Sequence, residues 1–234
     1  MDSGTFNRPR PGLPWIALVL LAALPWACGI AAEPPPEHTL LFFGDSLTAG
    51  YGLADPGTQS YPAQVQRKID AAGLPWHVVN AGLSGETSAG GLRRIDWVLN
   101  QHTDVFVLEL GANDGLRGTA PSVTEANLQA IIERVRSKYP RARIVLAGMR
   151  MPPNMGPDYA EQFQAIYPDL ARRNGVALIP FLLDGVAMKP EMNQGDGIHP
   201  TAAGAVVVAE SVWKTIEPIL RSGSSLLDKG HPPS

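Results

Sequence analysis

Short apolar runs alternate with longer amphipathic segments through most of this 234-residue chain, and this alternation constrains the fold more than any other feature. The apolar runs are continuous, as expected for strands of a parallel sheet that is covered on both faces. They lie at residues 39–43, 77–80, 104–110, 143–147 and 176–179. Strands that alternate with helices form α/β domains, so we predict an α/β fold with a parallel sheet of about five strands.

The amphipathic segments carry start and stop signals for helices. We predict helices at about residues 60–73, 122–140, 158–175 and 201–220. The sequence SVTE at residues 122–125 is a capping box, in which serine and glutamate satisfy free backbone N–H groups at a helix start. Pro168 falls inside the third pattern, so we expect a kink or a break there.

The first 32 residues are typical of a secretory signal peptide. Arginines precede an apolar stretch at residues 15–27, and small residues follow it. The stretch is short and contains prolines, so we expect no stable membrane span. A flexible arm or a retained anchor is the alternative. We therefore predict an exported protein, periplasmic or secreted.

The remaining chain divides into three parts. Residues 33–38 form a proline-rich linker, residues 39–221 form one domain, and residues 222–234 have no periodic pattern. We expect the last segment to be disordered. One domain of this size accounts for the whole core, and we expect a monomer.

Cys28 is the only cysteine, so an internal disulfide is excluded. It occupies the position where a lipid-modified cysteine would begin a mature lipoprotein. Pro25 and Trp26 fit poorly in the small, apolar positions before such a site. Export without lipidation is therefore the preferred interpretation.

Charge argues against a nucleic-acid partner. The formal net charge is −3, and no run of lysine or arginine occurs in the sequence. A protein that binds phosphate backbones needs a basic face. We therefore expect no nucleic-acid partner.

Ser46 lies in the stretch GDSLTAGY, directly after the first apolar run. Ligands of an open parallel sheet bind at the carboxyl ends of its strands, where this stretch is expected. Ser46 is a candidate nucleophile there, because backbone N–H groups at a helix start favour developing negative charge. The alternative is a serine that caps a tight turn, and the motif alone does not decide between them.

A serine hydroxyl needs a base within hydrogen-bonding distance to become a good nucleophile. Among the five histidines, only His199 lies in a loop at this edge with an acid beside it, in the sequence DGIHP. Asp196 is three residues earlier and is placed to orient the imidazole ring. An incomplete metal site that includes Asp114 is the alternative, but a fourth donor is not identified. We therefore predict no metal.

Acyl transfer also needs donors for an oxyanion. Gly85 can bring its N–H close to a ligand, and Asn113 offers a neutral amide. Asn113 is also a common turn residue in a segment such as GANDG. We interpret Asp45 and Asp114 as acceptors that brace loops, and Glu109 as a paired or solvated acid.

Four segments, FGDSLTAGY, NAGLSGETS, ELGANDGLRG and DGIHP, resemble the four sequence blocks of the SGNH-type, or GDSL-family, serine esterases. The resemblance implies a flavodoxin-like, three-layer α/β/α fold and no cofactor. It also implies Ser46 as nucleophile, His199 as base and Asp196 as its partner. The oxyanion hole would comprise the backbone N–H groups of Ser46 and Gly85 and the side chain of Asn113.

Within this family, the chain resembles secreted bacterial acyl-thioesterases, lysophospholipases and arylesterases. Met151 lies in a segment rich in methionine and proline, which suits a flexible wall for an acyl chain. Leu116 lies in a glycine-flanked loop after Asn113 that has the composition of a lid. We predict hydrolysis of a small acyl ester or thioester. A carbohydrate O-deacetylase and a non-catalytic exported binding module are the alternatives.

Overall fold

The computed structural model describes residues 1–2, 38–152 and 155–227. Residues 3–32 of the predicted signal peptide, which include Cys28, lie outside these residues, as does the end of the predicted tail. The domain is built on a five-stranded parallel sheet with the order β2-β1-β3-β4-β5. The strands are β1 (His38–Gly44), β2 (Trp76–Gly82), β3 (Val105–Glu109), β4 (Arg143–Ala147) and β5 (Ala177–Ile179).

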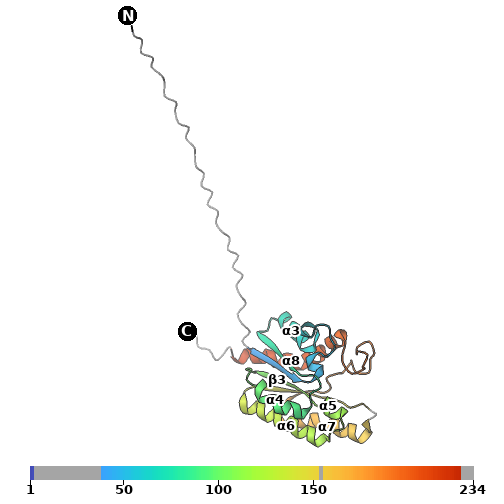
Figure 1. Cartoon of the computed structure of the whole chain (residues 1–234). Coiled ribbons are helices and arrows are strands. Elements are labelled where there is room, and N and C mark those ends of the chain that lie inside the picture. The colour runs from blue at the N-terminus through green and yellow to red at the C-terminus, as the bar shows by residue number, and fades with distance from the viewer. Residues whose placement is uncertain (3–37, 153–154, 228–234) are drawn as a thin grey trace. The chain divides into compact units, whose positions relative to one another are not determined.

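Helices cover both faces of the sheet, which gives three layers (Figure 1). Helices α3 (Tyr61–Ala71) and α8 (Ala202–Leu227) pack against each other on one face. Helices α4 (Ser88–Val98), α6 (Pro121–Lys138) and α7 (Pro157–Asn174) form the other layer. Three short helices lie in the connections: α1 (Ser46–Ala49), α2 (Pro56–Gln59) and α5 (Ala112–Leu116).

The predicted α/β fold and the five predicted strands are confirmed. Strands β1, β3 and β4 are almost entirely buried, as their continuous apolar sequences require. Strand β2 differs, because most of its residues are partly or fully exposed. It is the edge strand that follows β1 in the chain, so it has a neighbour on one side only.

Helix α4 is absent from the sequence prediction. Two adjacent glycines, Gly90 and Gly91, obscure its pattern, because glycine is a weak helix former. Gly91 is nevertheless needed, since a Cβ atom there would lie 2.4 Å from a Leu110 methyl carbon and 3.1 Å from the Phe43 ring. Close packing of α4 on the sheet therefore outweighs its weak intrinsic propensity.

The predicted cap of α6 was wrong, and of the kink or break expected in α7 the break does not occur. Ser122 does not cap α6; the N-cap is Ala120, and Pro121 occupies the first turn, where its fixed φ favours a helix start. Pro168 does not break α7, which continues to Asn174. Tyr167 and Leu170 on either side are buried in the core, and this packing compensates for the hydrogen bond that proline cannot donate.

The domain limits also differ from the prediction. His38 is the buried first residue of β1 and does not belong to the linker. Helix α8 continues past residue 222, where the sequence predicts a disordered tail. Arg143 holds the preceding turn of α8 by donating to the Ile219 carbonyl and the Ser222 hydroxyl. No helix among the described residues is long and apolar enough to cross a membrane.

Candidate active site

The sheet topology brings the predicted site residues to one edge. The chain leaves β1 toward β2 on one side and later returns to β3 on the other. The carboxyl ends of these strands therefore surround a topological switch point, where α/β proteins bind ligands. Ser46 begins α1 after β1, and Asn113 lies in α5 after β3.

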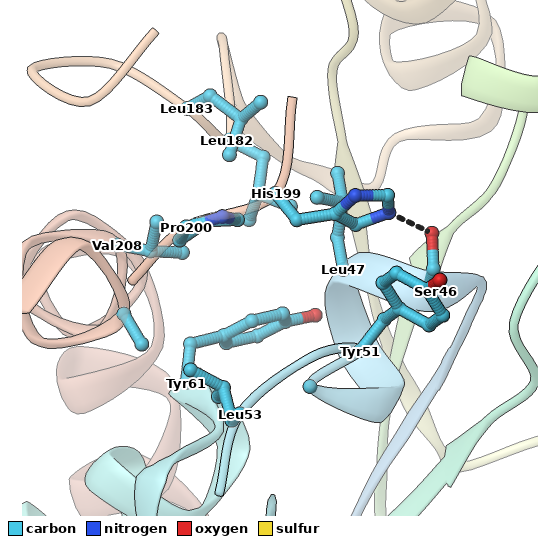
Figure 2. A pocket seen from close by; sticks show the side chains of 12 residues that line it. Ser46, Leu47, Tyr51, Leu53, Tyr61, Leu182, Leu183, His199, Pro200 and Val208 are labelled. Carbon is cyan, nitrogen blue, oxygen red and sulfur yellow. Dashed lines mark hydrogen bonds between the residues drawn. The ribbon is translucent and has the colours of Figure 1, made fainter. Parts of the chain in front are cut away.

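Ser46, His199 and Asp196 form a continuous hydrogen-bonded chain. The Ser46 hydroxyl oxygen lies 2.8 Å from His199 Nε2, and His199 Nδ1 lies 2.6 Å from Asp196 Oδ2 (Figure 2 shows the first of these bonds). The serine and the histidine are 153 positions apart in the sequence, and the fold brings them together. This arrangement places a base at the serine and a carboxylate behind the base, as serine nucleophiles require.

Asp196 also fixes the loop that carries His199. Its Oδ1 atom accepts hydrogen bonds from the backbone N–H groups of Ile198 and His199, at 2.9 and 3.0 Å. Slight burial raises the pKa of Asp196, but these N–H groups and the His199 ring outweigh it and lower the pKa to about 2. Asp196 is therefore ionised at neutral pH and stabilises positive charge on the imidazole.

Asp45, next to the candidate nucleophile, is fully buried. It is the N-cap of α1, where its Oδ1 atom accepts from the backbone N–H of Leu47 at 3.0 Å. Burial raises its pKa to about 6, although hydrogen bonds from Leu47 and Asn113 act in the opposite direction. The predicted role of Asp45 as a bracing acceptor agrees with these contacts.

Glu109 was predicted to be paired or solvated, and this is wrong. It is fully buried at the end of β3, and no basic side chain among the described residues forms an ion pair with it. Its Oε2 atom accepts from the backbone N–H of Asp45 at 3.1 Å and from the Thr48 hydroxyl at 2.7 Å. Burial, followed by repulsion from Asp45, raises the pKa of Glu109 well above its usual value.

Gly44 leaves the space that Glu109 occupies. The two residues are paired across β1 and β3. A Cβ atom at Gly44 would lie 2.2 Å from the Thr48 hydroxyl oxygen and 2.3 Å from Glu109 Oε2. Any side chain at Gly44 would thus displace the buried carboxyl group. The first glycine of the GDSL sequence is explained by this contact.

The predicted oxyanion donors differ in their hydrogen bonds. The backbone N–H groups of Ser46 and Gly85 donate to no other group in the part of the chain that the structure describes. Asn113 Nδ2 donates to Asp45 Oδ2 and to the Glu86 carbonyl, both at 3.0 Å. Both amide hydrogens of Asn113 are therefore engaged, and an oxyanion would have to share or replace one of these acceptors.

Two arginines brace the loop that carries Gly85, and the sequence analysis did not identify either. Arg94 forms an ion pair with the buried Glu86 and donates to the Ala81 carbonyl at 2.8 Å. Arg117, which follows α5, donates to the Gly85 carbonyl at 3.1 Å. Charged residues on a helix face usually indicate solvent exposure, so the pattern alone did not reveal these contacts.

Tyr51 is a further residue that the sequence analysis left without a role, although it ends the GDSLTAGY stretch. Its ring lies 4.7 Å from the His199 ring, centroid to centroid, at an angle of 46°. Figure 2 shows Tyr51 beside Ser46 and His199. The ring limits the orientations open to the imidazole, because aromatic pairs favour tilted or offset contact.

A small apolar pocket adjoins the serine and the histidine (Figure 2). Besides Ser46 and His199, its lining includes Leu47, Tyr51, Leu53, Tyr61, Leu182, Leu183, Pro200 and Val208. Met151 and Leu116 are not part of this lining. Met151 is partly buried and contacts Gly115 in α5, whereas Leu116 is exposed.

The alternative of a metal site receives no support from the geometry. Asp114 accepts two hydrogen bonds from Ser88, from the backbone N–H at 2.7 Å and from the hydroxyl at 2.6 Å. It braces the start of α4 and is not grouped with Asp196 and His199. No cluster of three or more potential metal ligands occurs among the described residues.

Comparison with known proteins agrees with this geometry. The model of the GDSL-like Lipase/Acylhydrolase family matches residues 42–207. The chain belongs to this family. It is 40% identical to Esterase TesA of Pseudomonas aeruginosa over 87% of this chain and 99% of the relative. It is 39% identical to Thioesterase 1/protease 1/lysophospholipase L1 of Escherichia coli strain K12, over 93% of this chain and 98% of the relative.

Among solved structures, the crystal structure of TesA is similar to this GDSL-family chain with a TM-score of 0.73. The sequences are 41% identical, and the match covers 77% of this chain and 99% of the other. The predicted family and the three-layer fold are therefore confirmed.

Proposed function

We propose that this chain is a serine esterase and thioesterase that forms an acyl-enzyme on Ser46. The observation that carries the proposal is the 2.8 Å contact between the Ser46 hydroxyl and His199 Nε2, with Asp196 behind the ring at 2.6 Å. The relatives reported above are named as an esterase and as a thioesterase and lysophospholipase. Their shared chemistry is the hydrolysis of an acyl bond.

The reaction proceeds in two steps. In the first, His199 Nε2 accepts the proton of Ser46, and the serine oxygen attacks the acyl carbon. The imidazolium then donates this proton to the departing alcohol or thiol. In the second step, His199 accepts a proton from water as the water oxygen attacks the acyl-enzyme, and the imidazolium returns this proton to the departing Ser46 oxygen, which releases the carboxylic acid and restores the enzyme. Asp196 stabilises the imidazolium each time.

Three donors stabilise the tetrahedral oxyanion in this proposal. The backbone N–H groups of Ser46 and Gly85 have no competing acceptor among the described residues. Asn113 contributes its amide by sharing the hydrogen that it donates to Asp45 or to the Glu86 carbonyl. Donors held in place before the reaction contribute most to this type of stabilisation.

The substrate in this proposal is a small molecule with an apolar acyl group. Met151 contacts α5, which carries Asn113, and Leu116 is exposed on the same helix. Both side chains are therefore near the oxyanion donors and suit an acyl chain. A series of p-nitrophenyl esters with short, medium and long chains measures this preference. A maximum at acetate, shared by acetylated sugars, would instead favour the O-deacetylase alternative.

We also propose that the mature protein is exported and acts as a monomer. The support for export is the sequence of residues 1–32, which has the charge, apolar length and small residues of a signal peptide. Intact mass of the protein from a periplasmic or secreted fraction measures the cleavage site. The same mass shows whether Cys28 is retained and lipidated.

Labelling by a fluorophosphonate tests the proposed nucleophile. We expect one label per chain, located on Ser46 by peptide mass, and loss of ester hydrolysis in parallel with labelling. Ser46→Ala should abolish both, with an unchanged melting temperature. Full turnover by Ser46→Ala would eliminate the acyl-enzyme, and an absence of both labelling and turnover in the wild type would favour a binding module.

A further inference from the structure

A chain of buried hydrogen bonds lies beneath α1 and ends at Glu109. Thr48, in the last part of α1, is fully buried, and its hydroxyl contacts Glu109 Oε2 at 2.7 Å and the hydroxyl of Tyr61 at 2.7 Å. A threonine hydroxyl carries one hydrogen. Since the carboxyl oxygen accepts that hydrogen, Tyr61 must donate to Thr48. The chain therefore runs from Tyr61 through Thr48 to Glu109.

The same carboxyl oxygen holds the other end of α1. Glu109 Oε2 accepts the backbone N–H of Asp45 at 3.1 Å. Ser46 lies between these two attachment points, Asp45 before it and Thr48 after it. One buried oxygen atom thus determines the position of the backbone on both sides of the proposed nucleophile.

The second carboxyl oxygen has a different environment. Glu109 Oε1 is buried and has no hydrogen-bond partner among the described residues. A buried carboxylate normally satisfies both oxygens, because an unpaired charge in the interior is costly. Burial and the nearby Asp45 raise the pKa of Glu109, which favours the protonated, neutral form. A proton on Oε1 would have no acceptor among the described residues, so neither form pairs this oxygen, whereas both forms allow Oε2 to accept its two hydrogen bonds.

We propose that Glu109 is a positioning residue, whose buried Oε2 atom holds Asp45 and Thr48 so that the Ser46 hydroxyl stays within reach of His199. The inference rests on the proposed function, because it assigns to Glu109 the alignment of that nucleophile. Glu109 itself contacts neither Ser46 nor His199 through a hydrogen bond. Its effect on the reaction is therefore indirect and concerns geometry.

A comparison of Glu109→Ala with Glu109→Gln tests this role, and Glu133→Ala, an exposed glutamate on α6, is the control. Glutamine is neutral and retains one acceptor oxygen. We expect Glu109→Ala to lower kcat about 10- to 100-fold, since small misplacement of a reacting group costs this much. We expect KM to change less than about threefold, because substrate contacts remain. Glu109→Gln and Glu133→Ala should retain most of the wild-type kcat.

Each outcome has a defined meaning. If Glu109→Ala keeps the wild-type kcat well below its melting temperature, Glu109 serves stability only, and the proposal is wrong. If Glu109→Gln loses as much kcat as Glu109→Ala, a charge is required and the proposal is also wrong. Ser46→Ala in the same series separates the proposed function from the positioning role of Glu109. The activity of Ser46→Ala tests the nucleophile independently of Glu109.

A second pair of variants covers the case in which Glu109→Ala fails to fold. Thr48→Val removes the hydroxyl but keeps the shape, whereas Thr48→Ser keeps the hydroxyl. We expect a lower kcat and a slower rate of fluorophosphonate labelling for Thr48→Val, with recovery of both in Thr48→Ser. Equal labelling rates for valine, serine and wild type would overturn the proposal.

Discussion

Asp45 precedes the proposed nucleophile in the chain and Asp196 supports its base, and the protein gives these two carboxylates different environments. Asp45 is fully buried, accepts from Leu47 and Asn113, and has a pKa raised to about 6. The Asp196 side chain is 37% exposed, accepts from two backbone N–H groups and the His199 ring, and has a pKa lowered to about 2. We call the surroundings of Asp45 and Glu109 the buried side of the site, and the surroundings of Asp196 and His199 the exposed side. The buried side positions the backbone at Ser46, and the exposed side supplies the negative charge that stabilises the imidazolium.

This difference follows from what each side has to do. A carboxylate that stabilises an imidazolium must remain ionised, so solvent and N–H donors near Asp196 are useful. The acids beneath α1 bind backbone and hydroxyl donors, and Asp45 and Glu109 would repel each other if both were charged. A site that separates these tasks can change one of them by mutation without changing the other.

Among the variants compared here, we expect the largest decrease in kcat for Asp196→Asn, on the exposed side. The asparagine oxygen can still accept the backbone N–H groups of Ile198 and His199, so the loop should remain folded. Its NH₂ group, however, would donate to His199 Nδ1 and leave the proton on Nε2, where the base must be free. We expect kcat to fall by about 10⁴, as this change of tautomer does in serine proteases. Ester hydrolysis measures kcat, and thermal unfolding should shift little.

An activity of Asp196→Asn close to wild type would mean that the exposed carboxylate only shapes the loop. The difference between the two sides would then have no chemical consequence. Asp196→Glu is a useful control, because it keeps the charge but displaces it from the backbone donors.

Asn113→Ala tests whether a residue that bonds to the buried side also acts in the reaction. Asn113 donates to Asp45 and to the Glu86 carbonyl. If it is an oxyanion donor, we expect turnover to fall roughly 100- to 1,000-fold. If it is only a turn residue that braces Asp45, the melting temperature should fall while turnover is preserved. Kinetics and unfolding of the same sample distinguish these results.

The two carboxylates should also affect stability in opposite pH ranges. The pKa of Asp45 is raised from 3.8 to about 6. Between these two pH values the folded state keeps a proton that the unfolded state has lost. The stabilising contribution of Asp45 to the free energy of unfolding is therefore fully present below pH 3.8 and is lost as the pH rises through about 6. One pKa unit corresponds to about 1.4 kcal/mol, so the change is on the order of 2–3 kcal/mol. The lowered pKa of Asp196 gives a contribution that is present above pH 3.8 and is lost as the pH falls toward 2.

Urea unfolding of wild type and Asp45→Asn across this range measures the first effect. Asparagine does not titrate, so the difference in unfolding free energy between the two proteins should change between about pH 4 and pH 7. Groups distant from Asp45 cancel in this difference, whereas Glu109 contributes to it, because the Asp45 charge is one cause of the raised pKa of Glu109. A difference that is constant with pH would mean that Asp45 does not gain its proton on folding.

The sequence predicted the exposed side of the site better than the buried side. The distance of three residues between Asp196 and His199 is local, and a single loop realises it. Ser46 and Asn113 follow strands whose apolar runs are unambiguous. The sheet topology then brings such strand ends together, so their approach could be expected from the pattern alone.

The buried side could not be derived in the same way. Glu109 interacts with Asp45, Thr48 and Gly44, which are more than 60 residues away in the chain, and a glutamate at the end of a strand is more often solvated. Arg94 and Arg117 also hold the loop of Gly85 through contacts to backbone carbonyls that no periodicity encodes. These residues depend on the register between strands and on side-chain directions, which exist only in the folded chain.

We expect the smallest decrease in kcat/KM from substitution of Tyr51, which lies on the exposed side. Its ring contacts the His199 ring at 4.7 Å, and the residue is 53% exposed. An aromatic contact of this kind contributes about 0.5–1.5 kcal/mol, so Tyr51→Ala should lower kcat/KM about 2- to 10-fold. Tyr51→Phe keeps the ring and should behave as wild type. If both variants lose activity equally, the hydroxyl is the important group, and the exposed side then contributes a hydrogen bond to the substrate as well as charge.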